Sequence, residues 1–208
     1  MITNNKVAEK IQECIQQKAI RLDIGQCGLT EIPSEIWEME WLKELILGNN
    51  PTVPDDYGFL KIDEQIYSRI FPEKDKMTIN DGGPNRFSSK ERYLLSRLPN
   101  LQYLNICSVG SASLIELSSL EKLSVLVAGE NEFLSFPTNS QKQKSGERFS
   151  KNEIEVLDFG RCESANYRWI FNSSSALSLR FLNLSHFKTN DYIFFTDLPN
   201  LVSLNLSN

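Results

Sequence analysis

Side chains that could carry out acid–base, nucleophilic or metal chemistry are few in this sequence and lie at unsuitable spacings. The 208 residues include one histidine, His186, so a two-histidine metal site is excluded. No Cys-x-x-Cys pair occurs, which removes the common zinc and redox motifs. Neither GQCGLTE nor KSGERFS fits the phosphate-binding pattern G-x-x-x-x-G-K-[ST]. The sequence therefore predicts a chain that is not an enzyme, with no catalytic residue, no metal site and no cofactor.

Composition and charge describe an ordinary globular chain. Hydrophobic residues make up 40% and charged residues 24%, as in water-soluble domains. The net charge of −5 argues against a nucleic-acid partner, because proteins that bind nucleic acids usually carry an excess of basic residues. No apolar run approaches the ~18 residues of a membrane span, and the first residues, MITNNKVAEK, do not resemble a signal peptide. We expect a cytoplasmic protein with no membrane partner.

One apolar spacing occurs twice between residues 19 and 50 and organises the chain. The copies begin at Ala19 and Leu42, 42 − 19 = 23 residues apart, with apolar residues at the first, fourth and sixth places and Cys27 or Asn50 at the ninth. On a strand, the fourth and sixth places face one side and the third and fifth the other. One coil cannot bury its apolar edge alone, so the spacing predicts coils stacked into a parallel sheet.

Five further copies follow. They begin at Leu101, Leu123, Ile154, Leu179 and Leu201, and their fourth places are Leu104, Leu126, Leu157, Leu182 and Leu204. Between the second and third copies, about residues 52–88 form an insertion, and a polar loop, 138–153, precedes the fifth. We interpret residues 1–18 as a helix that caps the first coil and residues 19–208 as one repeat domain. The final coil carries no capping sequence, which predicts either a longer natural chain or self-association through that coil.

The spacing matches the template L-x-x-L-x-L-x-x-N/C-x-L, and residues 19–50 resemble the leucine-rich-repeat family. The run LTEIPSEIWEMEWLKEL is similar to the intracellular variety in bacterial multidomain proteins, including Roco-type GTPases. The resemblance implies an α/β solenoid, a horseshoe of about seven repeats with a parallel sheet on its concave face. In this family the ninth-place Asn ties successive coils through backbone hydrogen bonds. His186 falls at an eighth place, where we expect an exposed rim residue.

The third and fifth places of the seven copies predict the binding surface. The third-place row is Arg21, Glu44, Tyr103, Val125, Val156, Phe181 and Ser203, and the fifth-place row is Asp23, Ile46, Asn105, Val127, Asp158, Asn183 and Asn205. An exposed apolar stripe bordered by polar residues has the composition of an interface. We therefore predict a protein partner on the concave face. Tyr103 and Phe181 would be its anchors, with Val125, Val127, Val156 and Ile46 beside them and Asp23, Asn105, Asp158 and Asn183 giving specificity.

Two alternatives stay open from the sequence. The apolar outward residues could simply satisfy strand propensity, since Val, Tyr and Phe favour strands. We expect the recognition module to be the N-terminal sensor region of a larger protein. The alternative is the regulatory part of a multidomain enzyme, whose Roco-type GTPase or signalling-protease domain would lie outside this chain.

Overall fold

The computed structural model describes most of the repeat stack but not every segment between its coils. The described residues are 3–48, 80, 82–88, 94–113, 120–131, 133–135, 153–162, 175–186 and 198–206. Most of the predicted insertion and nearly all of the predicted polar loop therefore lie outside the described residues.

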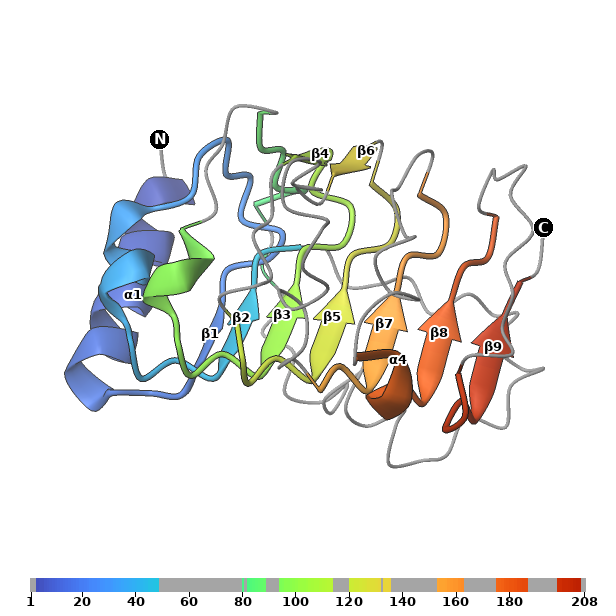
Figure 1. Cartoon of the computed structure of the whole chain (residues 1–208). Coiled ribbons are helices and arrows are strands. Elements are labelled where there is room, and N and C mark those ends of the chain that lie inside the picture. Colours follow the sequence, from blue (N-terminus) through green and yellow to red (C-terminus); the bar gives the residue numbers. More distant parts are fainter. Residues whose placement is uncertain are drawn as a thin grey trace, which may run out of the picture.

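Seven three-residue strands form one parallel sheet, as the spacing predicts (Figure 1). Each strand covers the third to fifth places of one copy, and neighbouring strands pair in register, third place to third place. The strands, in spatial order, are β1 (Arg21–Asp23), β2 (Glu44–Ile46), β3 (Tyr103–Asn105), β5 (Val125–Val127), β7 (Val156–Asp158), β8 (Phe181–Asn183) and β9 (Ser203–Asn205). The prediction of seven stacked coils is confirmed.

The fourth-place leucines form a continuous column in the core. Leu22 pairs with Leu45, and the series continues strand by strand to Leu204. Leu204 is half-buried, whereas the other six fourth-place side chains are at most 3% exposed. Burying each such side chain contributes about 1.5–3 kcal/mol, so this column is the main apolar support of the sheet.

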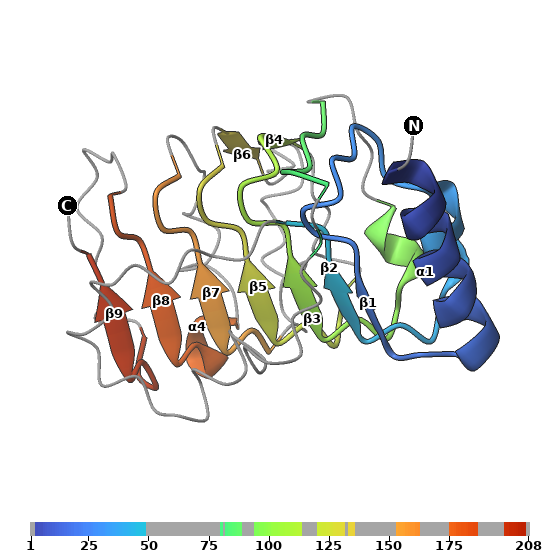
Figure 2. The same ribbon diagram turned by 180° about the vertical axis from the view of Figure 1, so that it is seen from behind.

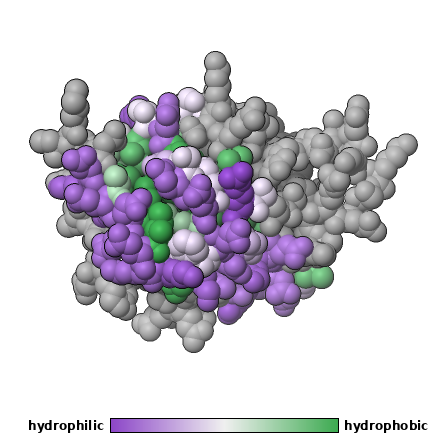
Figure 3. Space-filling view, turned by 90° about the vertical axis from the view of Figure 1, so that its left-hand side faces the viewer, coloured by the Kyte–Doolittle hydropathy of each residue, from purple (hydrophilic) through white to green (hydrophobic). Residues whose placement is uncertain are grey.

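Helix α1 (Thr3–Gln17) lies beside β1 and covers the first coil (Figures 1 and 2). Its inward face carries Val7, Ile11 and Cys14 at helical spacing, all buried, with Ile15 packed partly against the core. Seen from this end, the described surface is mostly hydrophilic, with a small hydrophobic area between the polar side chains (Figure 3). The helix thus closes the core at the β1 end of the stack.

Behind the sheet, the described return segments include short helical turns. Between β1 and β2, η1 (Ser34–Glu38) buries Ile36 and Trp37, and Ile32 and Met39 beside it are buried too. Pro33 precedes η1, where its fixed φ suits a bend. Later coils have the helical turns η4 (Leu95–Arg97) and α4 (Ser175–Ser178). A second, two-stranded parallel sheet is formed by β4 (Ser111–Ser113) and β6 (Phe133–Ser135).

The turn after each strand is the same in five coils. Its eighth-place residue is left-handed, with φ between 52° and 57° at Gln26, Ser108, Glu130, Arg161 and His186. This conformation aims the N–H at the next coil, where Ser108, Glu130 and Arg161 donate to the seventh-place carbonyl at 2.7–2.9 Å. His186 is exposed at this rim, as predicted.

The ninth place shows how an asparagine joins two coils. Asn131 Oδ1 accepts from the Val109 N–H at 3.0 Å, and its Nδ2 donates to the carbonyls of Ile106 at 2.9 Å and Ala128 at 2.7 Å. The side chain is 1% exposed. It therefore satisfies backbone groups of the coil before it and of its own coil, which the stacked strands leave unpaired.

In the second coil, Asn85 makes the bonds that the spacing assigns to Asn50. Its Oδ1 accepts from the N–H groups of Cys27 at 3.1 Å and Leu29 at 2.8 Å, and its Nδ2 donates to the carbonyls of Ile24 at 2.8 Å and Leu47 at 2.6 Å. Asn50 itself lies outside the described residues. Asn85, which the sequence places inside the insertion, thus lies within the repeat stack.

Candidate functional site

The predicted binding residues lie side by side on one face of the main sheet, which we call the outer face. Register places Arg21, Glu44 and Tyr103 next to one another in the third-place row. The same pairing brings Val125, Val156 and Phe181 together in the middle of that row. The spacing thus correctly predicts which residues are neighbours.

The expected exposure of these residues is wrong. Nine of the ten predicted contact residues are buried, and Asp23 alone is partly exposed. The exposed fractions of the nine are 7% for Tyr103, 5% for Ile46, 4% for Asp158, 3% for Val125, 2% for Asn105 and Asn183, 1% for Phe181, and 0% for Val127 and Val156.

Stacking gives part of the physical reason for this burial. A side chain on an inner strand stands between two like-placed neighbours, each about 4.8 Å away, so both of its flanks are covered. The tip of the side chain must be covered too, since less than a tenth of its surface is accessible to solvent. Apolar residues at these places therefore belong to buried structure, and their types follow from packing as well as from strand propensity.

The fifth-place polar residues end their strands by binding the backbone. Asp23, Asn105, Asp158 and Asn183 each accept, through Oδ1, the N–H two residues further on, at 2.9–3.1 Å. This is the Asx-turn bond that lets a short polar side chain turn the chain. Asn183 Nδ2 also donates to Asp158 Oδ1 at 2.8 Å, which joins two neighbouring coils. Three of these four side chains are buried, so the structure gives them a local role that the sequence analysis did not assign.

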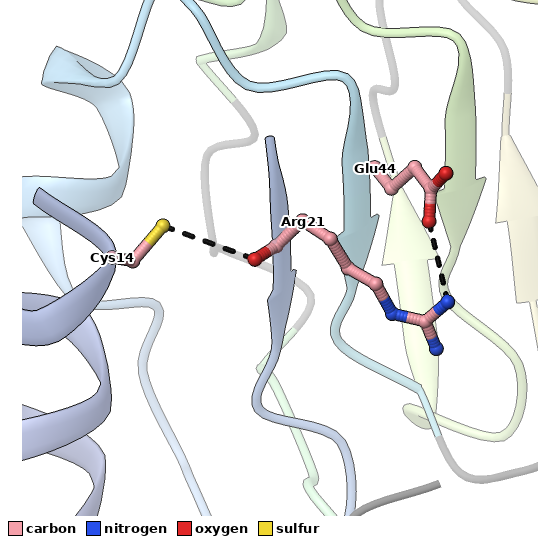
Figure 4. A network of polar contacts seen from close by, with 3 residues as sticks. All are labelled: Cys14, Arg21 and Glu44. Atoms are coloured by element: carbon pink, nitrogen blue, oxygen red, sulfur yellow. Dashed lines mark hydrogen bonds and ion pairs between the residues drawn. The ribbon is translucent and has the colours of Figure 1, made fainter. Parts of the chain in front are cut away.

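Charged residues of the outer face are accessible at its β1–β2 end, and the uncharged Asn205 on β9 is partly exposed at the opposite end. Arg21 Nη1 and Glu44 Oε2 are 3.3 Å apart, with 30% and 35% of the two side chains exposed (Figure 4). Arg21 is held on its other side as well, since the Cys14 Sγ of α1 lies 3.9 Å from its carbonyl oxygen (Figure 4). We call Arg21, Asp23 and Glu44 the charged end.

Asp23 is the centre of a polar contact between α1, β1 and the segment that returns to the second coil. Asn80 Nδ2 donates to Asp23 Oδ1 at 3.3 Å and to the Gly25 carbonyl at 2.6 Å. Lys10 Nζ donates to Asn80 Oδ1 and lies 3.4 Å from the Asp23 carbonyl oxygen. Burial raises the pKa of the Asp23 carboxyl above its ordinary value, and the Gly25 N–H, Lys10 and Arg21 act in the opposite direction.

The four cysteines are buried, and none of them forms a disulfide. Burial raises the pKa of the Cys14 and Cys107 thiols, and it raises that of Cys162 to about 12. A thiol with a raised pKa is protonated at neutral pH and is a weak nucleophile.

The described residues hold no cluster of three or more His, Cys, Asp or Glu side chains that could bind a metal ion. None of the helices they form has the length and apolar character that crossing a bilayer requires.

The sheet, its register and the asparagine bonds between coils decide the architecture. The chain is a leucine-rich-repeat solenoid. Repeats of this architecture are the scaffold on which the charged end is displayed, because each coil fixes its third and fifth places relative to those of the next.

No family model matches the chain, and no curated protein matches it. Two solved structures of leucine-rich-repeat proteins are similar to it. YopM from Yersinia enterocolitica WA-314 is 12% identical with a TM-score of 0.42, covering 98% of this chain and 41% of that one. An internalin (inlF) from Listeria monocytogenes str. 4b F2365 is 14% identical with a TM-score of 0.34, covering 93% and 62%. This chain spans less than two thirds of either.

Proposed function

We propose that this solenoid is a protein-recognition module and that its partner docks at the charged end of the outer face. The observation that carries the proposal is the contrast along the face. Arg21, Asp23 and Glu44 are partly exposed on β1 and β2, whereas the third- and fifth-place residues from β3 to β8 are buried. A partner approaching the sheet from its outer side meets these three charged side chains.

The charged end is suited to selecting a partner because its geometry is fixed before binding. The Arg21–Glu44 pair and the Asx-turn bond of Asp23 hold the groups in place, so a partner does not have to order them. Partly exposed charges contribute more to partner choice than to affinity. The partner must present an acceptor for Arg21 and donors for Asp23 and Glu44.

We propose that the nine buried residues of the predicted site support this surface from beneath. Tyr103 on β3 is the register neighbour of Glu44, so the charged end continues directly into the buried part of the third-place row. Of the ten predicted contact residues, Asp23 is the one that the partner contacts in this proposal, and the buried apolar ones keep the sheet rigid.

The charge pattern can be tested without breaking the ion pair. The double variant Arg21→Glu, Glu44→Arg keeps a pair of opposite charges but inverts the pattern. Proteins retained from an extract of the cells that make this chain are compared by quantitative mass spectrometry for the parent, the double variant and Glu31→Lys, an exposed control on the return segment. A partner kept by the parent and the control but lost by the double variant supports the proposal. Equal retention by an inverted variant with an unchanged melting temperature contradicts it.

The wider form of the proposal places the module in the cytoplasm as the sensor region of a larger signalling protein. The four cysteines form no disulfide, which supports this compartment because disulfides are rare in the reducing cytosol. The narrower likeness to Roco-type proteins stays a prediction.

Self-association through the last coil is a second proposal, supported by exposed apolar side chains around β9. Val202 is 61% and Leu206 47% exposed, and Leu201 and Leu204 are half-buried, although their counterparts in inner coils are buried. Val202→Asp should then lower the fraction of dimer seen by sedimentation at about 100 µM. Ile20→Asp is the matched control, since Ile20 is also a second-place residue and is 52% exposed at the opposite end of the sheet. A chain that is monomeric at this concentration, or a dimer unaffected by Val202→Asp, contradicts this proposal.

A further inference from the structure

The second coil is built from two separate stretches of the chain. Its first part is described as far as Gly48, the seventh place, and its ninth place is filled by Asn85. We infer that residues 49–83 are an insertion into a coil that is complete without them, and that the solenoid folds when they are removed. This inference is independent of the proposed function and concerns how the chain carries an extra segment.

Hydrogen bonds identify the place where the chain re-enters the coil. Asn85 bonds sixth- and ninth-place groups of the first coil and the sixth-place carbonyl of its own coil. Asn131 bonds the corresponding groups of the third and fourth coils. Asn85 is therefore the ninth-place residue of the second coil.

The residues after Asn85 continue the coil in order. The Arg86 N–H donates to the Leu29 carbonyl at 2.8 Å, and the Phe87 N–H donates to the Val109 carbonyl at 3.0 Å. Phe87 falls at the eleventh place and is 4% exposed, as Leu29 at the eleventh place of the first coil is 8% exposed. Residues 85–87 thus pack between the first and third coils.

Chain length fits the same conclusion. The starts of the second and third copies are 101 − 42 = 59 residues apart, and removing the 35 residues 49–83 leaves 24. The other steps without a long loop are 23, 22, 25 and 22 residues. The shortened coil would therefore have an ordinary period.

The junction imposes one conformational condition. Joining Gly48 to Pro84 puts Pro84 at the eighth place, where all five described eighth-place residues have φ between 52° and 57°. Proline is fixed near φ −65° and cannot adopt this turn, whereas glycine adopts it readily. The deletion must therefore carry Pro84→Gly, and the deletion that keeps Pro84 is its matched control.

The deletion also removes some contacts. The Gly82 N–H donates to the Gln26 carbonyl at 3.0 Å, the Gly28 N–H donates to the Gly83 carbonyl at 2.9 Å, and Asn80 bonds Asp23 and Gly25. Among the described residues these are a few partly exposed hydrogen bonds, so we expect the unfolding midpoint to fall by no more than about 10 °C.

Thermal unfolding followed by circular dichroism tests the inference. The variant lacking 49–83 with Pro84→Gly should unfold cooperatively within about 10 °C of the parent, and the variant keeping Pro84 should melt well below it. Adding Asn85→Ala to the glycine variant should also lower its midpoint, because Asn85 is the ninth-place residue in the shortened coil as well.

A second variant separates a poor junction from an essential segment. It keeps residues 80–88 and replaces 49–79 with a Gly/Ser linker of equal length. Hydrogen exchange should then show the Cys27 and Leu29 amides, which bond Asn85, protected as in the parent. Loss of cooperative unfolding in both the deletion and the linker variant would overturn the inference. So would equal stability of the proline and glycine deletions, because the re-entry point would then not be the eighth place.

Discussion

Asn85 stands in the same relation to the first and second coils as Asn131 does to the third and fourth. Both side chains accept from ninth-place N–H groups and donate to sixth-place carbonyls, and both are at most 1% exposed. The bond between coils is therefore a property of position in space and not of distance along the sequence.

Replacing Asn85 should be far more damaging than replacing Asn50. Asn85→Ala leaves two N–H groups and two carbonyls without their partner in a buried setting, for which we expect a loss of about 3–5 kcal/mol of unfolding free energy. Asn50→Ala should change it by less than about 0.5 kcal/mol. Urea unfolding of the two variants measures both values. A larger loss for Asn50→Ala than for Asn85→Ala would show that Asn50 is the ninth-place residue.

Local spacing predicts the sheet but cannot predict which asparagine joins the first two coils. The steps between fourth-place leucines specify register, because shifting a strand by one residue would turn Leu45 or Leu104 out of the core. The GNN sequence at 48–50 fits the template locally, and nothing in it shows that the chain leaves the coil. A weak signal was present in Asn85-Arg86-Phe87, which repeats the N-x-F of Asn131 and Phe133. With Asn85 at the ninth place, the buried eleventh-place residue is Phe87, whereas with Asn50 it would be the polar Thr52. Burial of the larger apolar side chain favours Asn85.

Phe181→Ala should destabilise the fold instead of weakening only a surface contact. The Phe181 side chain is 1% exposed, and truncating a buried Phe costs about 3–5 kcal/mol. Val202→Ala, at a 61% exposed position near the same end of the sheet, is the control and should cost less than about 0.5 kcal/mol. Chemical denaturation gives both values. If Phe181→Ala had no more effect than the control, Phe181 would be a surface residue as the sequence predicts.

The exposure of the outer face is harder to predict than the fold, because it depends on residues far away in the sequence. Tyr103, Val125 and Phe181 alternate with core leucines, which correctly assigns them to the opposite side of the strands. Alternation cannot tell whether that opposite side is open to solvent. Arg21 and Glu44 lie in the same third-place row, but the sequence signal for an interface is apolar composition, which these two charged residues lack.

Asp23 should make the protein lose stability as the pH rises from about 4 toward neutral. Its pKa in the folded state is above the ordinary 3.8, so the folded protein keeps a proton that the unfolded chain has already released. The contribution is present below pH 3.8 and is lost as the pH rises through the raised pKa. Asp23→Asn removes this titration and can keep the bond to the Gly25 N–H, as Asn105 does to Cys107. We expect a gain in stability at pH 7 and a flatter pH profile in urea unfolding.

The exposed Glu31→Gln serves as the control for Asp23→Asn and should leave the profile unchanged. A loss of stability in Asp23→Asn at pH 7 would show that attraction of the carboxylate to Lys10 and Arg21 exceeds the cost of its burial.

Thiol labelling should show whether helix α1 opens before the inner coils do. The buried thiols with raised pKa values should not react with a maleimide in the native state at pH 7, and each should react only after local or global unfolding. Cys14 lies on α1, which packs against the stack on one side, whereas Cys107 and Cys162 lie among inner coils. Fraying of a terminal helix needs less free energy than opening inner coils, so Cys14 should be labelled first. Mass spectrometry of peptides from samples quenched over time gives the order, and simultaneous labelling of all three would show that α1 unfolds together with the whole solenoid.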